Sequence, residues 1–237
     1  SWAFYSMIII ATWWDVYHSA CQTYGFTRIY DIKTGNTSLS LRIQDRILNC
    51  LIYIGPIIGG VSLIAHIKPD ENYYRMLFLS DIPFYANQYS KALLILVLIF
   101  SACFIPYYFY CAWKQSKIHP VSYQKILILS FTAIVSILAW GFNSFGYAFL
   151  IANFFHAWQY YAMIYNSEKK TFSNQLKLTD SKASLLVSSL LVIVTITMAG
   201  LLILTKGNRL TISIFTTIAI CHFWFDGFIW SVEKKHI

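Results

Sequence analysis

Long apolar stretches separated by short polar intervals make up most of the chain. Seven of these stretches hold roughly the 20 residues that a helix needs to cross a bilayer core of about 30 Å. They fall near residues 2 to 22, 46 to 67, 91 to 113, 122 to 143, 145 to 166, 183 to 205 and 210 to 231. Strand-like alternation does not recur, and backbone polar groups in lipid must be satisfied within the segment. The pattern therefore predicts an all-α fold, a polytopic integral membrane bundle of about seven transmembrane helices.

Composition and the polar intervals agree with one membrane domain. The 237 residues are 57% hydrophobic and 12% charged, and their mean hydropathy is +0.55, which is typical of a polytopic membrane protein. The longest polar intervals, about 23 to 45 and 68 to 90, are too short for a soluble core. We expect a turn-rich connection with a short amphipathic piece in the first and an interfacial cap rich in aromatic residues in the second. The chain is predicted to form a single transmembrane helical domain over 1–237.

The distribution of basic residues predicts the orientation. The formal net charge is +8, but Lys and Arg lie at helix ends and not along one soluble face, so no nucleic-acid partner is expected. The side that holds the C-terminal ends of the odd-numbered stretches carries most of them: Arg28, Lys33, Arg42, Arg46, Lys114, Lys117, Lys125, Lys169, Lys170, Lys177, Lys182, Lys234 and Lys235. The other side carries Lys68, Arg75, Lys91, Lys206 and Arg209. The positive-inside rule then predicts a cytoplasmic C-terminus in a multi-pass protein of the inner or plasma membrane.

Smaller features predict details of packing. The uncharged run 143 to 146 joins two apolar stretches and favours a tight antiparallel hairpin whose helices are neighbours. Gly55, Gly59 and Gly60 allow a close helix approach or a kink. The cysteines show no metal or redox spacing, and we expect free, buried thiols at Cys21, Cys50, Cys103, Cys111 and Cys221.

Three histidines within apolar stretches are the strongest functional signal. His18, His156 and His222 lie on stretches one, five and seven, which run in the same direction. They precede the basic residue at the end of their stretch by ten, thirteen and twelve residues. At about 1.5 Å per residue, these offsets place the three rings within roughly one helical turn of each other in depth.

Polar neighbours one turn away accompany each of these histidines. Asp15 is three residues before His18, and Asp226 is four residues after His222. Of the ten acidic residues, only these two aspartates lie within apolar stretches, and each shares a helix face with a histidine. The polar residues one turn from His156 are Asn153, Gln159 and Tyr160.

This set of residues is typical of a metal site. An ionisable group at bilayer depth costs about 2.5 to 3.5 kcal/mol on insertion scales and defaults to a functional hypothesis. We expect His18, His156 and His222 to bind a divalent transition metal, with iron preferred and zinc, manganese or copper as alternatives. Asp15 and Asp226 complete or orient the site, and Tyr160 donates a proton. The expected function is a membrane-bound oxidoreductase acting on a lipid-soluble substrate.

Residues beside the histidines are expected to contact the substrate. We assign this role to Gln22, Arg28, Asn153, Gln159 and Trp224. An arginine at the cytoplasmic end suits a phosphate or carboxylate head group, although a snorkelling arginine explains it equally well. The tryptophans near the histidines suit a flat apolar pocket or a lipid-facing belt.

Three other functions remain open on the sequence. The same His and Asp pairs suit a proton- or cation-coupled transporter or channel subunit. A non-catalytic subunit of a larger membrane complex, partnered by other membrane subunits as well as lipids, is a further alternative. A purely structural knot of interhelical hydrogen bonds is the last. The sequence has no lysine in its last stretch to form a retinal Schiff base, and no HExxH, GxSxG, Walker or dinucleotide motif.

Overall fold

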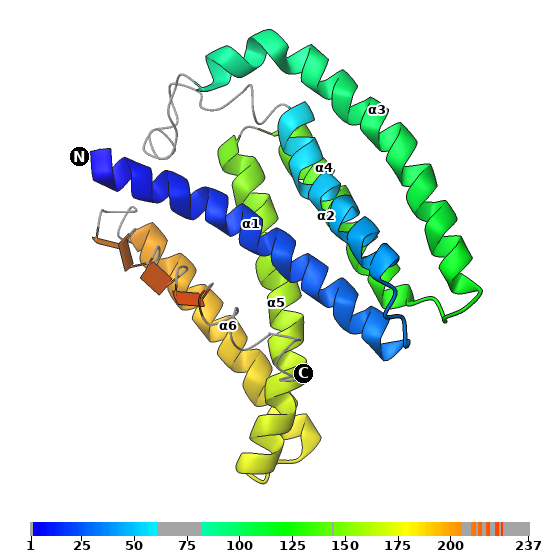
Figure 1. Ribbon diagram of the computed structural model, residues 1–237. Coiled ribbons are helices and arrows are strands. Elements are labelled where there is room, and N and C mark those ends of the chain that lie inside the picture. Colours follow the sequence, from blue (N-terminus) through cyan, green and yellow to red (C-terminus); the bar gives the residue numbers. More distant parts are fainter. Residues whose placement is uncertain are drawn as a thin grey trace. The chain divides into compact units, whose positions relative to one another are not determined.

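The computed structural model describes residues 2–60, 82–143 and 145–204, together with residues 210, 211, 213, 214, 217, 218, 221, 222 and 224. The continuous ranges hold six helices and no strand, and the separate described residues from 210 to 224 are also helical, so the all-α prediction is confirmed for the described residues. Figure 1 labels the helices, which are α1 (Trp2–Lys33), α2 (Leu39–Gly59), α3 (Ile82–Ser116), α4 (Tyr123–Phe142), α5 (Phe145–Gln175) and α6 (Asp180–Leu204).

Three of the helices are long and apolar enough to cross a membrane. They are Lys91–Ser116 within α3, all of α4 and Asp180–Thr197 within α6, with mean hydropathies of 2.4, 2.0 and 1.5. These spans support a membrane protein, but among the described residues they do not confirm seven spans. The hydropathy of α1, α2 and α5 is lower because each of these helices also carries charged or strongly polar residues, and 210 to 231 lies mostly outside the described residues.

The first predicted interval is mostly helical, which corrects the expectation of a turn-rich connection. Helix α1 continues through Lys33 and α2 begins at Leu39, so only five residues join them. Gly35 adopts a φ of 75° in this turn, a conformation that glycine tolerates best. The side chain of Ser38 caps α2 by accepting a hydrogen bond from the backbone N–H of Leu41. The second interval is also helical from Ile82 onward, while 68–81 of the expected cap lie outside the described residues.

The chain divides into two compact units, Ser1–Ala152 with His222–Ile237, and Asn153–Cys221. In the first unit α2 packs on both α3 and α4, and α1 packs on α2 and α4. Ile57, Ala139, Trp140 and Ala148 form one buried cluster, in which the start of α5 lies against the end of α4. The two helices meet at these ends, but α4 and α5 are not among the helix pairs that pack along one another, so the predicted tight hairpin stays a prediction.

Glycine permits the closest helix contact in this unit. A Cβ atom on Gly60 would lie 2.2 Å from the carbonyl oxygen of Pro56 and 2.4 Å from that of Trp140. Both atoms belong to backbone and cannot swing aside. The predicted close approach at the glycines of α2 is therefore confirmed at Gly60.

Hydrogen bonds between helices reinforce the first unit. Ser136 of α4 donates to the carbonyl oxygen of Ile52 at 2.6 Å, and Asn49 of α2 donates to that of Ala20 at 2.7 Å. Tyr53 donates to the carbonyl oxygen of Ser19 at 3.0 Å. In a membrane such bonds join helices that share no strong hydrophobic attraction for each other.

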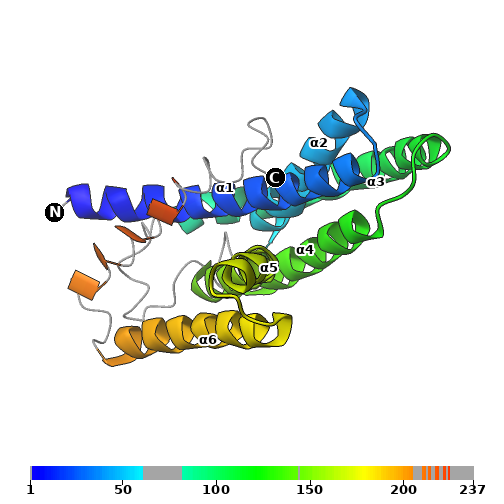
Figure 2. The same cartoon turned by 90° about the horizontal axis from the view of Figure 1, so that it is seen from below.

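The second unit contains the rest of α5 and α6, which turns back from the end of α5 (Figure 1) and is seen side-on in Figure 2. The hydroxyls of Tyr161 and Thr195 lie 2.8 Å apart, and those of Tyr165 and Ser184 are also hydrogen-bonded. Side-chain hydroxyls therefore join the two helices at two levels.

All five cysteines are free, as predicted, but they are not buried. Four have exposed side chains and Cys111 is half-buried. A thiol is a small and weakly polar group, so it tolerates the outer surface of a membrane helix as well as the interior. Apolar sequence context alone therefore did not reveal which way these side chains point.

Candidate functional site

The first unit places the rings of His18 and His222 side by side. His18 lies on α1 and His222 in the C-terminal helical residues, 204 positions later in the chain. Their ring centroids are 5.4 Å apart with an angle of 73° between the planes, and each offers a nitrogen within 4.8 Å of the other. Two nitrogens bound at about 2.1 Å to one ion are at most about 4.2 Å apart. A small rotation of either ring would let the pair share an ion.

Polar residues of α1 extend along the same helix face. Asp15 precedes His18 by three residues and is half-buried, and Gln22 follows it by four. Both polar atoms of the Gln22 side chain are buried, and they have no hydrogen-bond partner among the described residues. A buried amide without partners costs about 1 to 3 kcal/mol, so this position suits a polar ligand group or water.

The other predicted site residues lie elsewhere in the chain or outside the described part of it. His156 is a buried residue of α5 in the second unit. On the same helix, Asn153, Gln159 and Tyr160 are half-buried. Asp226 lies outside the described residues. The structure brings the rings of His18 and His222 together, and the assignment of any of these residues as a metal ligand remains a prediction from the sequence.

The tryptophans near the histidines are exposed where the structure describes them. The exposed fractions are 39% for Trp13, 51% for Trp14, 66% for Trp158 and 67% for Trp224. Amphipathic rings at the surface of an apolar helix are typical of the belt at a membrane interface. The exposure favours the lipid-facing interpretation over a pocket wall.

A buried cluster of four charged residues, the ion cluster, is the main feature that the sequence did not reveal. Its members are Arg28 and Asp31 of α1, Asp45 of α2 and Lys125 of α4. The Nζ atom of Lys125 lies 2.8 Å from Asp31 Oδ2 and 2.7 Å from Asp45 Oδ2. A guanidinium nitrogen of Arg28 lies 2.9 Å from Asp31 Oδ2 and 3.7 Å from Asp45 Oδ2. Tyr108 of α3 donates its hydroxyl to Asp45 Oδ1 at 2.8 Å, so the cluster links four helices.

The cluster is electrically balanced and almost completely shielded from solvent. Two cations face two carboxylates, and Asp45 has an exposed fraction of 0%. Burial raises the pKa of Asp31, while the ammonium of Lys125 and the guanidinium of Arg28 oppose this shift. Buried charges of this kind require nearly complete pairing, because their desolvation offsets most of their mutual attraction.

Arg28 is the one predicted substrate residue that belongs to this cluster. The guanidinium group of Arg28 is already paired with the carboxylates of Asp31 and Asp45. Neither interpretation of Arg28 from the sequence, as a ligand of a substrate head group or as a snorkelling arginine, included this pairing. The spacing of three residues between Arg28 and Asp31 was visible in the sequence. Their partners on other helices had no local signal, since Lys125 follows Asp31 by 94 residues and Asp45 by 80.

Comparison of the chain with protein-family models, with curated protein sequences and with solved structures finds no match. The function proposed below therefore rests on the residues of this chain alone.

Proposed function

We propose that this protein is an integral-membrane enzyme that depends on a divalent transition metal bound by His18 and His222, with His156 as the third ligand. The proposed reaction class is oxidation or reduction of a lipid-soluble substrate. The single observation that carries the proposal is the juxtaposition of the His18 and His222 rings, 5.4 Å apart between centroids. His156 is included because of its position in the sequence. It is predicted to lie at the same membrane depth as His18 and His222, on a stretch that runs in the same direction as theirs.

The residues suit a metal for two reasons. Imidazole is a common ligand for iron, zinc, copper and manganese, and ionisable side chains within apolar helices default to a functional role with a named partner. Asp15, one turn from His18 in the sequence, is proposed to bind the ion or to fix the tautomer of a ligand ring. Asp226 and Tyr160 keep their proposed roles as a second carboxylate and a proton donor.

Iron is the preferred metal because of the ligand type and the environment. Two or three histidines with a carboxylate leave open positions, which is the pattern of non-haem iron sites that activate oxygen. Helices that are long and apolar enough to cross a membrane, Lys91–Ser116 and Tyr123–Phe142 among them, place the protein where a lipid-soluble substrate is concentrated. Gln22, Asn153 and Gln159 are the residues of the chain proposed to contact that substrate within the site, and the exposed Trp224 is proposed to contact it from the lipid-facing side.

Elemental analysis of the full chain, purified in detergent, tests the proposal. We expect about one equivalent of metal in the wild type and its loss from His18→Ala and His222→Ala, because each change removes one of the ligands on which the proposal depends. The His119→Ala variant is the matched control, since His119 lies in the loop before α4 and is not part of the His18 and His222 ring pair. Metal bound equally by His18→Ala and wild type would refute the site.

A His156→Ala variant tests the third ligand separately. Loss of metal supports the full set of three, whereas retention would show that the third ligand is another residue while leaving the pair intact. Addition of nitric oxide to the ferrous protein, followed by electron paramagnetic resonance, reports whether open positions remain on the ion.

The same experiments distinguish the alternative functions. A transporter or channel subunit that uses Asp15 and His18 would be metal-free and would carry protons or cations in sealed vesicles. A non-catalytic subunit would be metal-free and silent in flux assays, and it would copurify with other membrane proteins.

A further inference from the structure

We propose that the groove between α2, α3 and α4 binds one neutral, long-chain amphiphile, a molecule with an uncharged hydroxyl or carbonyl head and an apolar tail. The groove belongs wholly to the first unit, and neither His18 nor His222 lines it. The proposal is therefore independent of the metal site.

The size and direction of the groove suit an extended chain. Its cavity volume is about 1010 Å³, at the upper end of the roughly 300 to 1,000 Å³ of ligand pockets. Along α4 its lining runs from Ser122 to Phe142, which corresponds to about 30 Å at 1.5 Å per residue. The groove is therefore about as long as the hydrocarbon core of a bilayer is thick.

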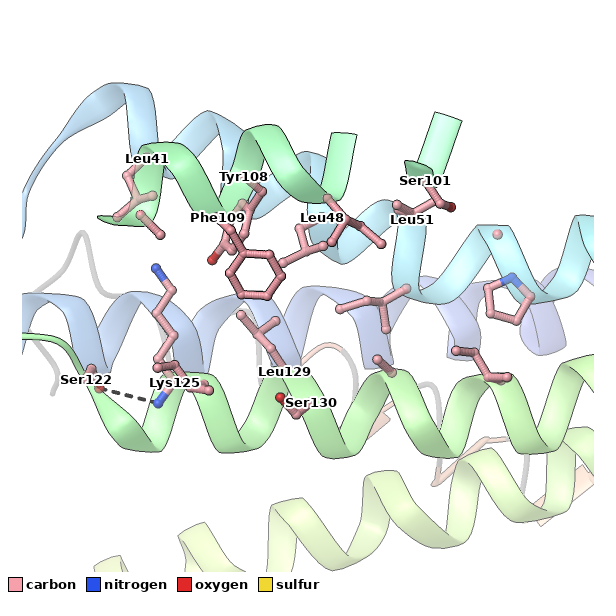
Figure 3. Close-up of a pocket in the computed structure, with 18 of the residues that line it drawn as sticks. Leu41, Leu48, Leu51, Ser101, Tyr108, Phe109, Ser122, Lys125, Leu129 and Ser130 are labelled. Atoms are coloured by element: carbon pink, nitrogen blue, oxygen red, sulfur yellow. Dashed lines mark hydrogen bonds between the residues drawn. The ribbon is translucent and has the colours of Figure 1, made fainter. Parts of the chain in front are cut away.

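Most of this length is apolar. Leu48 and Leu51 of α2 form one wall, Phe109 of α3 reaches across, and Leu129 of α4 lies opposite (Figure 3). The end of the groove near Gly60 and Phe142 carries no charged residue in its lining. An alkyl or isoprenoid chain is complementary to this surface, because both are apolar and both are removed from water when they come into contact.

The opposite end of the groove is polar. Asn36, Gln115 and Ser122 lie there together with Asp31 and Lys125 of the ion cluster. Figure 3 shows the side chain of Lys125 extending from α4 toward Leu41 of α2. A polar end joined to a long apolar trench is complementary to an amphiphile with one small head group.

Charge balance decides which head group fits. Lys125 directs two of its three N–H donors at Asp31 and Asp45. An anionic head would have to displace a carboxylate that lies 2.7 or 2.8 Å away. A cationic head would add a third positive charge to a cluster whose two carboxylates are already paired. A neutral oxygen needs no displacement, since it can accept the remaining N–H of Lys125.

Matched lipids in mixed micelles test the proposal on the full-length protein. The probes are dioleoylglycerol and dioleoylphosphatidate, which share their chains and differ in the charge of the head. We expect saturable binding of radiolabelled dioleoylglycerol at one molecule per chain, with dioleoylphosphatidate competing at least tenfold more weakly. Equal or stronger competition by the phosphatidate, or the absence of saturable binding, would overturn the proposal.

Substitutions that fill the groove locate the binding. Ser130 is an exposed serine of α4 that lines the groove (Figure 3), and Ser130→Trp should lower the affinity for dioleoylglycerol at least tenfold. Leu127→Trp is the matched control, because Leu127 lies on the same helix, is 55% exposed and does not line the groove. It should change the affinity less than twofold.

A second variant guards against a folding defect. Ser101→Phe fills the groove from α3, where the Ser101 hydroxyl donates to the carbonyl oxygen of Val97 in the same helix. Both filled variants should melt at the wild-type temperature while losing the lipid. Wild-type affinity in either folded variant would overturn the proposal. A wild-type protein that is dimeric in the micelle and becomes monomeric on Ser130→Trp would also overturn it, because a second copy of the chain would then be the occupant.

Discussion

Removing one charge from the ion cluster should destabilise the protein strongly. Removing one cation together with one carboxylate should cost about as much free energy as one single change and not the sum of two. The Lys125→Met variant leaves one guanidinium facing two carboxylates, a net charge of −1 in a buried site. The Asp45→Asn variant leaves a net charge of +1. With Lys125 Nζ 2.7 Å from Asp45 Oδ2, the attraction alone is about 6 kcal/mol at an effective dielectric constant of 20. After desolvation, each single change should cost about 3 to 5 kcal/mol.

The double variant Lys125→Met with Asp45→Asn restores electrical balance. Arg28 and Asp31, 2.9 Å apart, remain as a neutral pair, and the new amide oxygen can still accept the hydroxyl of Tyr108. Its cost should therefore stay near that of one single change, about 3 to 5 kcal/mol, which implies a coupling energy of about 3 kcal/mol or more.

Unfolding in mixed micelles with increasing dodecyl sulfate, followed by tryptophan fluorescence, gives these free energies. Lys114→Met is the control, because Lys114 is an exposed lysine near the end of α3 and should shift the free energy by less than about 0.5 kcal/mol. If the two single changes simply add in the double variant, the four charges do not act as one buried unit and the reasoning is refuted.

Three further outcomes are expected. Gly60→Ala should cost more than the usual 1 to 3 kcal/mol of overpacking, because its Cβ would meet two carbonyl oxygens at 2.2 and 2.4 Å; Gly25→Ala, whose Cβ meets nothing within 4 Å, should leave the thermal midpoint unchanged or raise it. Ser136→Ala removes the 2.6 Å hydrogen bond to Ile52 and should cost about 0.5 to 1.5 kcal/mol in the same micelle titration. Chelation should lower the melting temperature of the wild type but not of His18→Ala, since a bound ion stabilises only the folded state; an equal response of both proteins would contradict the metal proposal.

The bounds of a helix could be predicted from the sequence where a long apolar stretch forms nearly the whole helix. The stretch 122 to 143 became α4, Tyr123–Phe142, and 183 to 205 became α6, Asp180–Leu204. Both helices carry their charged residues only in the first turn and are predominantly apolar beyond it, so burial in lipid and helix formation favour similar boundaries.

Helix ends that depend on distant partners could not be predicted. The charged residues between 28 and 46 resemble a loop in sequence, yet they are helical because Asp31 and Asp45 meet Lys125 inside the bundle. Local pattern carries no information about a partner 80 or 94 residues away. The proximity of His18 and His222 could be predicted in part. Basic residues mark the membrane surface in the sequence, so counting residues from them gives the depth of each histidine in the bilayer.

The order of synthesis gives the ion cluster a further consequence. Asp31 and Asp45 leave the ribosome well before Lys125, the cation that contacts both of them, so the first two helices cannot complete their final packing until α4 has been made. We expect a nascent chain arrested before residue 123 to be cleaved rapidly by membrane proteases, and one arrested well beyond α4 to resist them. We therefore expect the final packing of the first two helices to wait for one lysine that is synthesised about 80 residues after the second of its two partners.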